Sequence, residues 1–228
     1  MKIASSRSPR WLPYRVMRRF AIANVCQLYQ SPIDKMPRSP VPDGFTIEAC
    51  SSDQLRSHAH ELEYQIPERD LNLLDTGNAK CFAAFHSESL AGFAWVAFGD
   101  IPGDMNHDGK PETGLPIQLS DDAAFIFQVL VLPAYRGRRL YAAIMSQMAD
   151  QLQTNGIQTL VLTTEGTNHR ALKAVDRMGF QNVGQASLFR IGPLSKAKYP
   201  LLPNDIGFTI GRYVGDKTAV HSSQLSHQ

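Results

Sequence analysis

The stretch FIFQVLVLPAYRGRRLY, residues 125–141, decides the fold of this chain. Residues 125–132 form an almost continuous apolar run that ends at Pro133, which is typical of a central strand covered on both faces. A basic turn around Gly137 follows. Beyond the turn, apolar residues recur every fourth position and predict an amphipathic helix that ends near Asn155-Gly156; they are Leu140, Ile144, Met148 and Leu152.

The turn between this strand and this helix has the chemistry of an anion site. The first amides of a helix have no partner inside the helix, and the helix dipole places positive charge at the same end. Arg136, Arg138 and Arg139 add Coulombic attraction and forked hydrogen bonding. A pyrophosphate group would fit here.

Helices and strands alternate on either side of this segment. A capped helix after Thr167-Asn168, with Val175 and Met178 inward, ends at Gly179. Ser51-Ser52-Asp53 offers caps for another helix through Leu55, Ala59 and Leu62. Predicted strands cover residues 45–49, 81–85, 90–98, 159–163, 187–191 and 208–214, and the second and third of these form a hairpin.

The segment from residue 99 to residue 122 is polar and rich in Gly and Pro, which indicates an exposed loop. Asp104, Asn106 and Asp108 imitate the start of a calcium loop. The final acidic ligand of such a loop would fall at Leu115, so the spacing excludes it. We expect no metal in this protein.

Residues 128–141 resemble the pyrophosphate-binding motif of the GNAT acyltransferase superfamily, in which a strand of the form Leu-x-Val-x-Pro leads to Arg-Gly-x-Gly-x-Gly or a close variant. The second hallmark of that family, Asn-x-x-Ala followed by a helix and Gly-Phe, appears at Asn168, Ala171, Gly179 and Phe180. The resemblance covers residues 45–195 and is strong over 125–180. It implies an α/β fold with a mixed sheet, splayed central strands and flanking helices.

The resemblance also implies a site for acetyl-CoA or another acyl-CoA as co-substrate. Backbone groups of the strand would pair with the pantetheine arm, and the amides of residues 136–141 would hold the diphosphate. The backbone N–H of Val129 would stabilise the developing oxyanion. The expected cofactor-binding residues are Val129, Leu130, Val131, Arg136, Gly137, Arg138, Arg139, Leu140, Tyr141 and Asn168.

Two departures from the family pattern affect this site. Arg139 and Tyr141 replace the later glycines of the turn, and Val175 replaces the Tyr that many members use as general acid. Water or Tyr141 would then donate the proton to the leaving thiolate. Glu165 is the first candidate for the general base, although a solvated loop acid is the other interpretation of this residue; Asp122 and Gln128 are weaker candidates.

The resulting function is an acyl-CoA-dependent N-acyltransferase, an acetyltransferase in the first instance, that acts on an unidentified amine by direct attack. A regulatory module that binds CoA with weak catalysis is the alternative. Nucleic acid is a poor partner, because outside residues 1–40 the chain is acidic by count. Neither the acceptor nor the oligomeric state can be read from the sequence.

Three segments are expected: a basic arm and Pro-rich linker over residues 1–44, the acyltransferase domain over 45–215, and a tail over 216–228. Residues 1–40 hold eight Lys or Arg and one acid, Asp34. We expect the arm to dock on the domain as a helix or strand; peripheral contact with a membrane surface is the alternative. Three cysteines in no metal-ligand spacing, and no secretory or membrane-spanning apolar run, predict a cytoplasmic protein.

Overall fold

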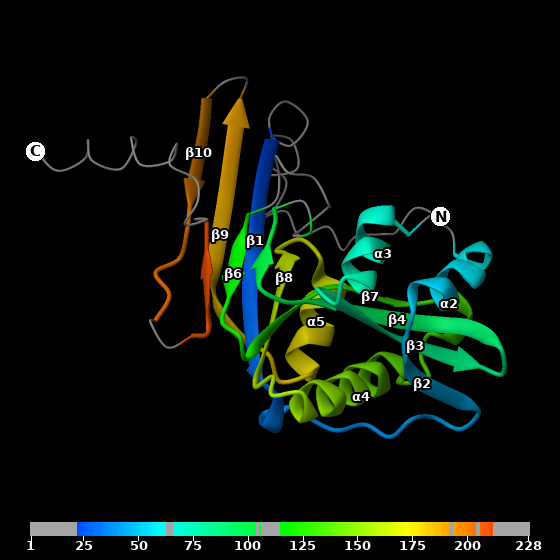
Figure 1. Ribbon diagram of the computed structural model, residues 1–228. Helices are drawn as coiled ribbons and strands as arrows, with labels where there is room; N and C mark the ends of the chain where they lie inside the picture. Colours follow the sequence, from blue (N-terminus) through cyan, green and yellow to red (C-terminus); the bar gives the residue numbers. More distant parts are fainter. Residues whose placement is uncertain are drawn as a thin grey trace, which may run out of the picture.

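The computed structural model describes residues 22–62, 66–103, 105, 115–191, 194–203 and 206–211 (Figure 1). Its strands are β1 (Ile22–Pro32), β2 (Phe45–Cys50), β3 (Ala79–His86), β4 (Ser89–Ala97), β5 (Asp100–Ile101), β6 (Ile117–Leu119), β7 (Ala123–Val131), β8 (Thr159–Glu165), β9 (Gln181–Ile191), β10 (Leu194–Lys198) and β11 (Phe208–Ile210). Eight of them form one sheet in the order β10-β9-β1-β8-β7-β4-β3-β2, and the others form a small sheet in the order β11-β6-β5.

Helices cover both faces of the large sheet, which confirms the predicted mixed α/β fold. On one face, α4 (Leu140–Thr154) and α5 (His169–Arg177) bury apolar side chains such as Ile144 and Val175. On the other face lie α2 (Ser52–Ser57), α3 (Glu68–Asp75) and the small sheet. Within the described residues, no helix is both long and apolar enough to cross a membrane.

The central strands β7 and β8 run parallel but pair over only four residues each. Residues 123–126 of β7 pair with residues 159–162 of β8. Beyond this point β7 continues to Val131 along β4, while β8 continues to Glu165 along β1. The two strands therefore separate, and the predicted splay lies between residues 127–131 and residues 163–165.

A bulge in β7 coincides with the start of this splay. The register with β4 pairs Ile126 with Val96 and Gln128 with Trp95, so that Phe127 is the extra residue. Phe127 packs against Trp95, with ring centroids 5.8 Å apart. A bulge bends its strand and increases the local twist, which turns the rest of β7 away from β8.

The first described strand, β1, lies inside the large sheet between β8 and β9. The sequence analysis expected the arm to dock on the domain as a helix or strand but began the domain at residue 45, whereas residues 22–32 form a strand inside its sheet. Cys26 and Leu28 are fully buried at alternate positions, in the period-two pattern of a strand. Only two apolar side chains make up that inward face, and the polar residues between them concealed it. Residues 1–21 lie outside the described part of the chain.

The carboxyl-terminal strands also differ from the prediction. β9 begins at Gln181 rather than at residue 187, and β10 was not predicted. A register shift opposite Gly184 interrupts the alternation of β9 and hides its first half in the sequence. β11 belongs to the small sheet, together with β5 and β6 from the predicted loop. The imitation calcium loop and the tail over 216–228 lie outside the described residues.

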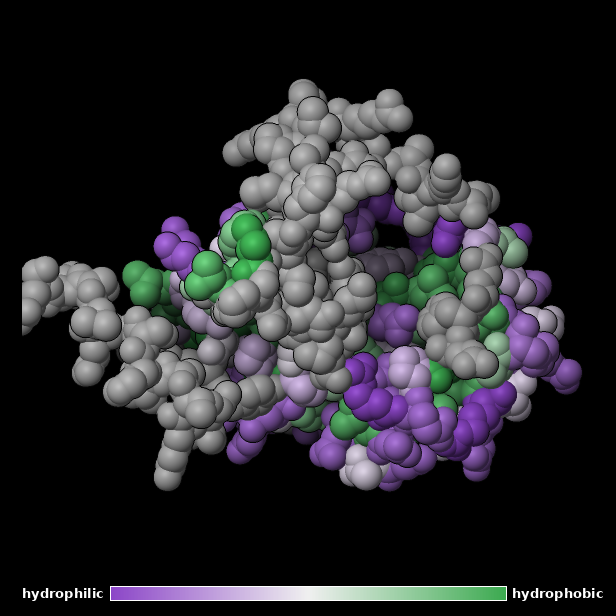
Figure 2. All heavy atoms as spheres, turned by 90° about the horizontal axis from the view of Figure 1, so that it is seen from above, coloured by the Kyte–Doolittle hydropathy of each residue, from purple (hydrophilic) through white to green (hydrophobic). Residues whose placement is uncertain are grey.

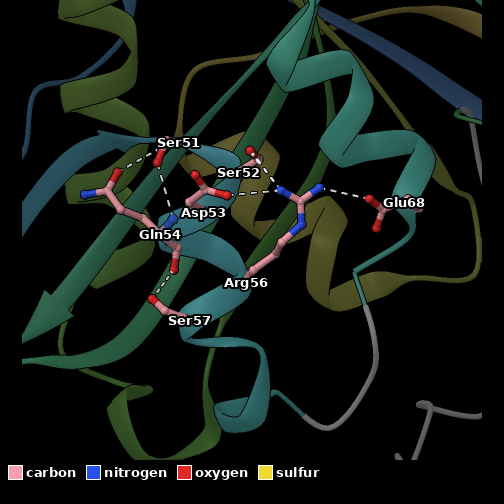
Figure 3. A network of polar contacts seen from close by, with 7 residues as sticks. All are labelled: Ser51, Ser52, Asp53, Gln54, Arg56, Ser57 and Glu68. Carbon is pink, nitrogen blue, oxygen red and sulfur yellow. Dashed lines mark hydrogen bonds and ion pairs between the residues drawn. The ribbon is translucent and has the colours of Figure 1, made fainter.

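Helix α2 begins at a Ser51 cap, as the sequence predicted, and the cap is part of a capping box with Gln54 (Figure 3). The Ser51 hydroxyl accepts a hydrogen bond from Gln54 N at 3.3 Å, and the Gln54 side chain accepts one from Ser51 N at 2.8 Å. Arg56 then joins α2 to the start of α3 through Glu68, at 2.9 Å. The helix ends at Ser57 and continues only as a 3-10 turn, η3 (Ala59–Glu61), so it is shorter than predicted.

Replacing Ser51 with Ala should lower the free energy of unfolding by about 1 kcal/mol, because the amide of Gln54 loses its acceptor. Urea denaturation followed by circular dichroism measures this as a lower midpoint with an unchanged slope. Ser57→Ala is the matched control, since Ser57 lies at the other end of the same helix; its effect should stay within about 0.5 kcal/mol. Equal losses in both variants would contradict a specific contribution from the cap.

Candidate active site

The backbone of β7 faces the splay at two of the predicted positions. Leu132 N donates to Ala91 O of β4 at 2.9 Å. Because backbone groups alternate in direction along a strand, those of Leu130 also point to β4, and those of Val129 and Val131 point toward the gap beside β8. The Val129 N–H thus points toward the gap, and its role as an oxyanion donor stays a prediction, while the backbone groups of Leu130 point to β4.

Strand β4 holds β7 closely at this point because it carries a glycine. A Cβ atom on Gly92 would lie 2.6 Å from Leu130 O and 3.1 Å from the Cα atom of Val131. Contacts this short with backbone atoms would force the strands apart. Gly92 therefore fixes the position of the β7 edge that borders the splay.

The turn after β7 presents backbone amides to the surface. After a 3-10 turn, η4 (Pro133–Tyr135), the four residues 136–139 are exposed, and a Cβ atom on Gly137 would have nothing within 4 Å. Ala143 N donates to Arg139 O at 3.2 Å and is the first amide with a partner inside α4. The amides of Leu140, Tyr141 and Ala142 precede it and have no helical acceptor.

Arg139 adopts a left-handed backbone conformation, which is typical of glycine. Its φ is 60°, in the left-handed region, where a residue other than glycine costs about 1 kcal/mol or more. Arg139 therefore adopts a conformation that glycine favours, which places a strained arginine at the N-cap of α4. Strained residues of this kind concentrate at binding and catalytic sites.

The three arginines of the turn are not equivalent. Arg136 Nε donates to Val131 O at 3.1 Å, so this side chain ties the turn back to the splayed strand. Arg138 and Arg139 are exposed beside the free amides of α4. Amides and guanidinium groups in this arrangement suit a diphosphate, and the binding of such a ligand here stays a prediction.

Glu165 is the last residue of β8 and lies at the open end of the splay. It pairs with Cys26, so its side chain is on the face covered by α2 and α3. Gln128, opposite Trp95, lies on the same face from the other side of the gap. The loop after Glu165 is held by Gly166 N donating to Val25 O at 3.2 Å and Asn168 N donating to Glu165 O at 2.9 Å.

Asp122 does not belong to this site. It precedes β7 at the paired end of the strand, where its carbonyl accepts from Gln158 N at 2.7 Å and its carboxylate from the Ser120 hydroxyl at 2.5 Å. Six residues of extended strand, about 20 Å, separate Asp122 from Gln128. Its candidacy as a general base was wrong.

Asn168 is the N-cap of α5. Its Oδ1 accepts a hydrogen bond from Ala171 N at 3.1 Å, and the residue is exposed. In this chain the Asn and Ala of the family's Asn-x-x-Ala pattern are thus the two partners of the hydrogen bond that caps α5. The capping role occupies Oδ1 and leaves Nδ2 as the group that a cofactor would contact; that contact stays a prediction.

The sequence analysis missed Asn24, which β1 brings to the same face as Glu165. Asn24 lies two residues before Cys26 and is 1% exposed, and within the described chain neither Oδ1 nor Nδ2 has a hydrogen-bond partner. Buried polar atoms are rarely left without partners, because desolvation costs more than 1 kcal/mol. The alternation of Asn24, Cys26 and Leu28 was the signal that would have found it.

Burial keeps Tyr141 and the three cysteines protonated. Burial raises the pKa of Tyr141 to about 12 and that of Cys26 to about 11. Burial likewise raises the pKa of Cys50 to about 11 and that of Cys81 well above its usual range. At neutral pH the Tyr141 phenol is a hydrogen-bond donor but a weak acid, and the buried thiols are poor nucleophiles.

A separate cavity of about 640 Å³ opens between the α2–η3 segment and the β3–β4 turn. His58 and Glu61 line it and contact each other, Nδ1 to Oε1, at 2.6 Å. Glu61 Oε2 also accepts from Leu90 N at 2.9 Å, which holds this pair against the sheet. No residue of β7 or β8 lines the cavity, so it is distinct from the splay.

The fold and this site together define a class: an α/β protein whose parallel central strands splay beside an anion-binding strand–turn–helix segment. The profile of the acetyltransferase (GNAT) family matches residues 47–180, more than half of the chain. The chain belongs to the GNAT acetyltransferase family, as the resemblance of residues 125–180 predicted.

Known proteins agree with this assignment. The chain is 28% identical over 107 residues to ribosomal protein bS18-alanine N-acetyltransferase of Escherichia coli K12, which covers 43% of this chain and 72% of that enzyme. Among solved structures, a tandem GNAT protein from the clavulanic acid biosynthesis pathway gives a TM-score of 0.52 at 12% identity and covers 88% of this chain. A GNAT acetyltransferase from Colwellia psychrerythraea gives 0.51 at 18% identity and covers 79%.

This chain spans 62% of the length of each of those two structures, and at such low identity they establish the fold alone. The described residues contain no group of three or more His, Cys, Asp or Glu that could hold a metal ion. The site residues must therefore be tested directly.

Charge reversal in the turn tests the anion site. Arg138→Glu should weaken acetyl-CoA binding at least about tenfold, since it replaces attraction to the diphosphate by repulsion, and the effect should shrink at high salt. Isothermal titration calorimetry measures the affinity. Arg177→Glu, the same change at the far end of α5, should leave it unaltered. Unchanged affinity in Arg138→Glu would remove the turn from the cofactor site.

Proposed function

We propose that this protein transfers an acetyl group from acetyl-CoA to a primary amine of a polypeptide. One observation carries the proposal: β7 and β8 cease to pair after Ile126 and Leu162, and the backbone groups of Val129 and Val131 face the resulting gap. An extended ligand that reaches this gap from the turn at Gly137 finds both hydrogen-bonding edges and anion-binding amides along its path.

Acetyl-CoA supplies a thioester whose acyl carbon is the electrophile. The residues that would hold the co-substrate are those of the turn and of β7. Amides of residues 137–142, with Arg138 and Arg139, would bind the diphosphate. Val131 would accept or donate along the pantetheine arm once Arg136 releases its carbonyl. This route leads the acyl end toward Val129.

The acceptor amine would lose its proton to Glu165. This carboxylate ends β8 on the face that carries α2 and α3, opposite the face on which α4 lies, so the amine would approach from the side away from α4. The Val129 N–H would donate a hydrogen bond to the carbonyl oxygen as negative charge develops on it. Tyr141, protonated at neutral pH, would stabilise the leaving thiolate by a hydrogen bond.

The polypeptide acceptor is suggested by the relative from E. coli, whose described substrate is an alanine of a ribosomal protein. That likeness covers less than half of this chain, so it does not define one particular acceptor. The proposal therefore names polypeptide amines as a class. Asn24 is buried on the same face as Glu165, and its side-chain amide has no hydrogen-bond partner among the described residues, which supports a role in positioning the acceptor.

The second candidate function is a CoA-binding regulatory module with weak catalysis. Val175 favours it, because many family members carry a Tyr general acid at this position. Here the side chain is apolar, 3% exposed and packed in the core beneath α5. Both functions require the same co-substrate site. They differ in turnover, which the following measurement resolves.

Calorimetric titration with acetyl-CoA, combined with release of free thiol on a panel of peptides with free amino termini, tests the proposal. Binding with thiol release on peptides supports polypeptide acetylation. Binding without release on any peptide would favour the regulatory module, and absence of binding would overturn both. The protein's own thiols should react slowly in this assay, because all three cysteines are buried and their pKa values are raised.

Glu165→Gln should lower kcat about a hundredfold or more, with the acetyl-CoA affinity within about twofold, since general bases contribute factors of this order. Asp121→Asn, a neutralisation in the exposed turn before β7, is the matched control and should retain full activity. A kcat that falls by less than about twofold in Glu165→Gln would assign the base to another group.

A further inference from the structure

The exposed apolar side chains of this protein gather in one segment. Among the described residues, the large hydrophobic side chains that are exposed all fall between residues 189 and 201. The most exposed of them are Ile191 at 53%, Leu194 at 77% and Leu201 at 101%, while Phe189 and Tyr199 are exposed at 36% and 37%. Apolar surface concentrated in this way marks an interaction site more often than chance exposure.

These side chains lie on the β9–β10 hairpin and the segment that follows it. Leu194 pairs with Ile191, and Lys196 pairs with Phe189, so these four residues share one face of the sheet. β8 ends opposite Cys26, whereas β1 and β9 continue past it. The hairpin therefore projects beyond the neighbouring strands (Figure 1), and Figure 2 shows apolar surface over this end of the molecule.

The charge around this apolar surface is positive. Lys196 and Lys198 are exposed on β10, and the sequence from residue 181 to residue 203 contains no Asp or Glu. The chain enters β1 at Ile22, which pairs with Arg190 of the same hairpin, after 21 residues that hold six Lys or Arg and no acid. Outside residues 1–21 and 181–203 the chain is net negative, so the excess of positive charge in the sequence falls in these two segments.

We propose that the hairpin end, formed by Phe189, Ile191, Leu194, Lys196 and Lys198, docks on the surface of an anionic lipid bilayer. Apolar side chains that project from a positively charged rim enter the boundary between headgroups and acyl chains, while the lysines contact lipid phosphates. The contact is peripheral. It uses β9 and β10, and not the splay between β7 and β8 or the co-substrate turn.

Two other occupants fit the surface less well. A second copy of the chain pairing along β10 would bring lysines of two edge strands together, and lysine on an edge strand opposes such pairing. A nucleic acid would use the positive charge, but it would leave Ile191 and Leu194 without apolar contacts. An anionic bilayer accounts for both the charge and the exposed hydrophobic residues.

Co-sedimentation of the full chain with vesicles tests this proposal. Binding is expected to vesicles of equal parts phosphatidylcholine and phosphatidylglycerol, to weaken with salt, and to be absent with phosphatidylcholine alone. The double variant Lys196→Glu, Lys198→Glu should bind at least about thirtyfold more weakly. Lys173→Glu, on the exposed side of α5, should bind as the unmodified protein does.

The apolar contribution is tested by Ile191→Ser combined with Leu194→Ser, which should bind the same anionic vesicles several-fold more weakly while its acetyl-CoA affinity and thermal unfolding stay unchanged. Failure of the unmodified protein to bind anionic vesicles would overturn the proposal. Equal losses of vesicle binding in Lys173→Glu and in the lysine double variant would also overturn it. So would a dimer or an RNA complex that forms in place of vesicle binding and is weakened by the double serine variant.

Discussion

The register between β7 and β8 is the constraint on which the rest of the structure depends. Four residues on each strand pair in parallel, and then the bulge at Phe127 turns β7 away. Backbone hydrogen-bonding groups beyond that point need other partners, since an unpaired group in a sheet is costly when it is shielded from water. The gap therefore lies between β7, whose other edge pairs with β4, and β8, whose other edge pairs with β1.

The parts of the fold that depend on local sequence could be predicted. The run at residues 125–132, the four-residue repeat after Leu140 and the Ser51 cap each act within a few residues, and the structure has them almost where they were expected. β1 depends instead on strands far away in the sequence. Its inward face consists of Asn24, Cys26 and Leu28, which become a core pattern only between β8 and β9.

The candidate site divides in the same way. Its co-substrate half is one continuous segment, so the motif, the turn and the arginines could be read together; even there, the backbone direction of Leu130 and the contact of Arg136 required the structure. The acceptor half joins β1, β7 and β8 across one face. Proximity along the chain suggested Glu165, but only the register could add Asn24 and remove Asp122.

The hydrogen bond from Arg136 to the Val131 carbonyl has a consequence for selectivity. A ligand amide that pairs with this carbonyl exchanges one hydrogen bond for another, so the pairing itself contributes little net affinity. Net gain arises when the displaced guanidinium finds a new anionic partner, which a bare pantetheine lacks and a diphosphate provides. The strand and the turn would then select a ligand that carries both a pantetheine arm and a diphosphate over a ligand that carries only one of them.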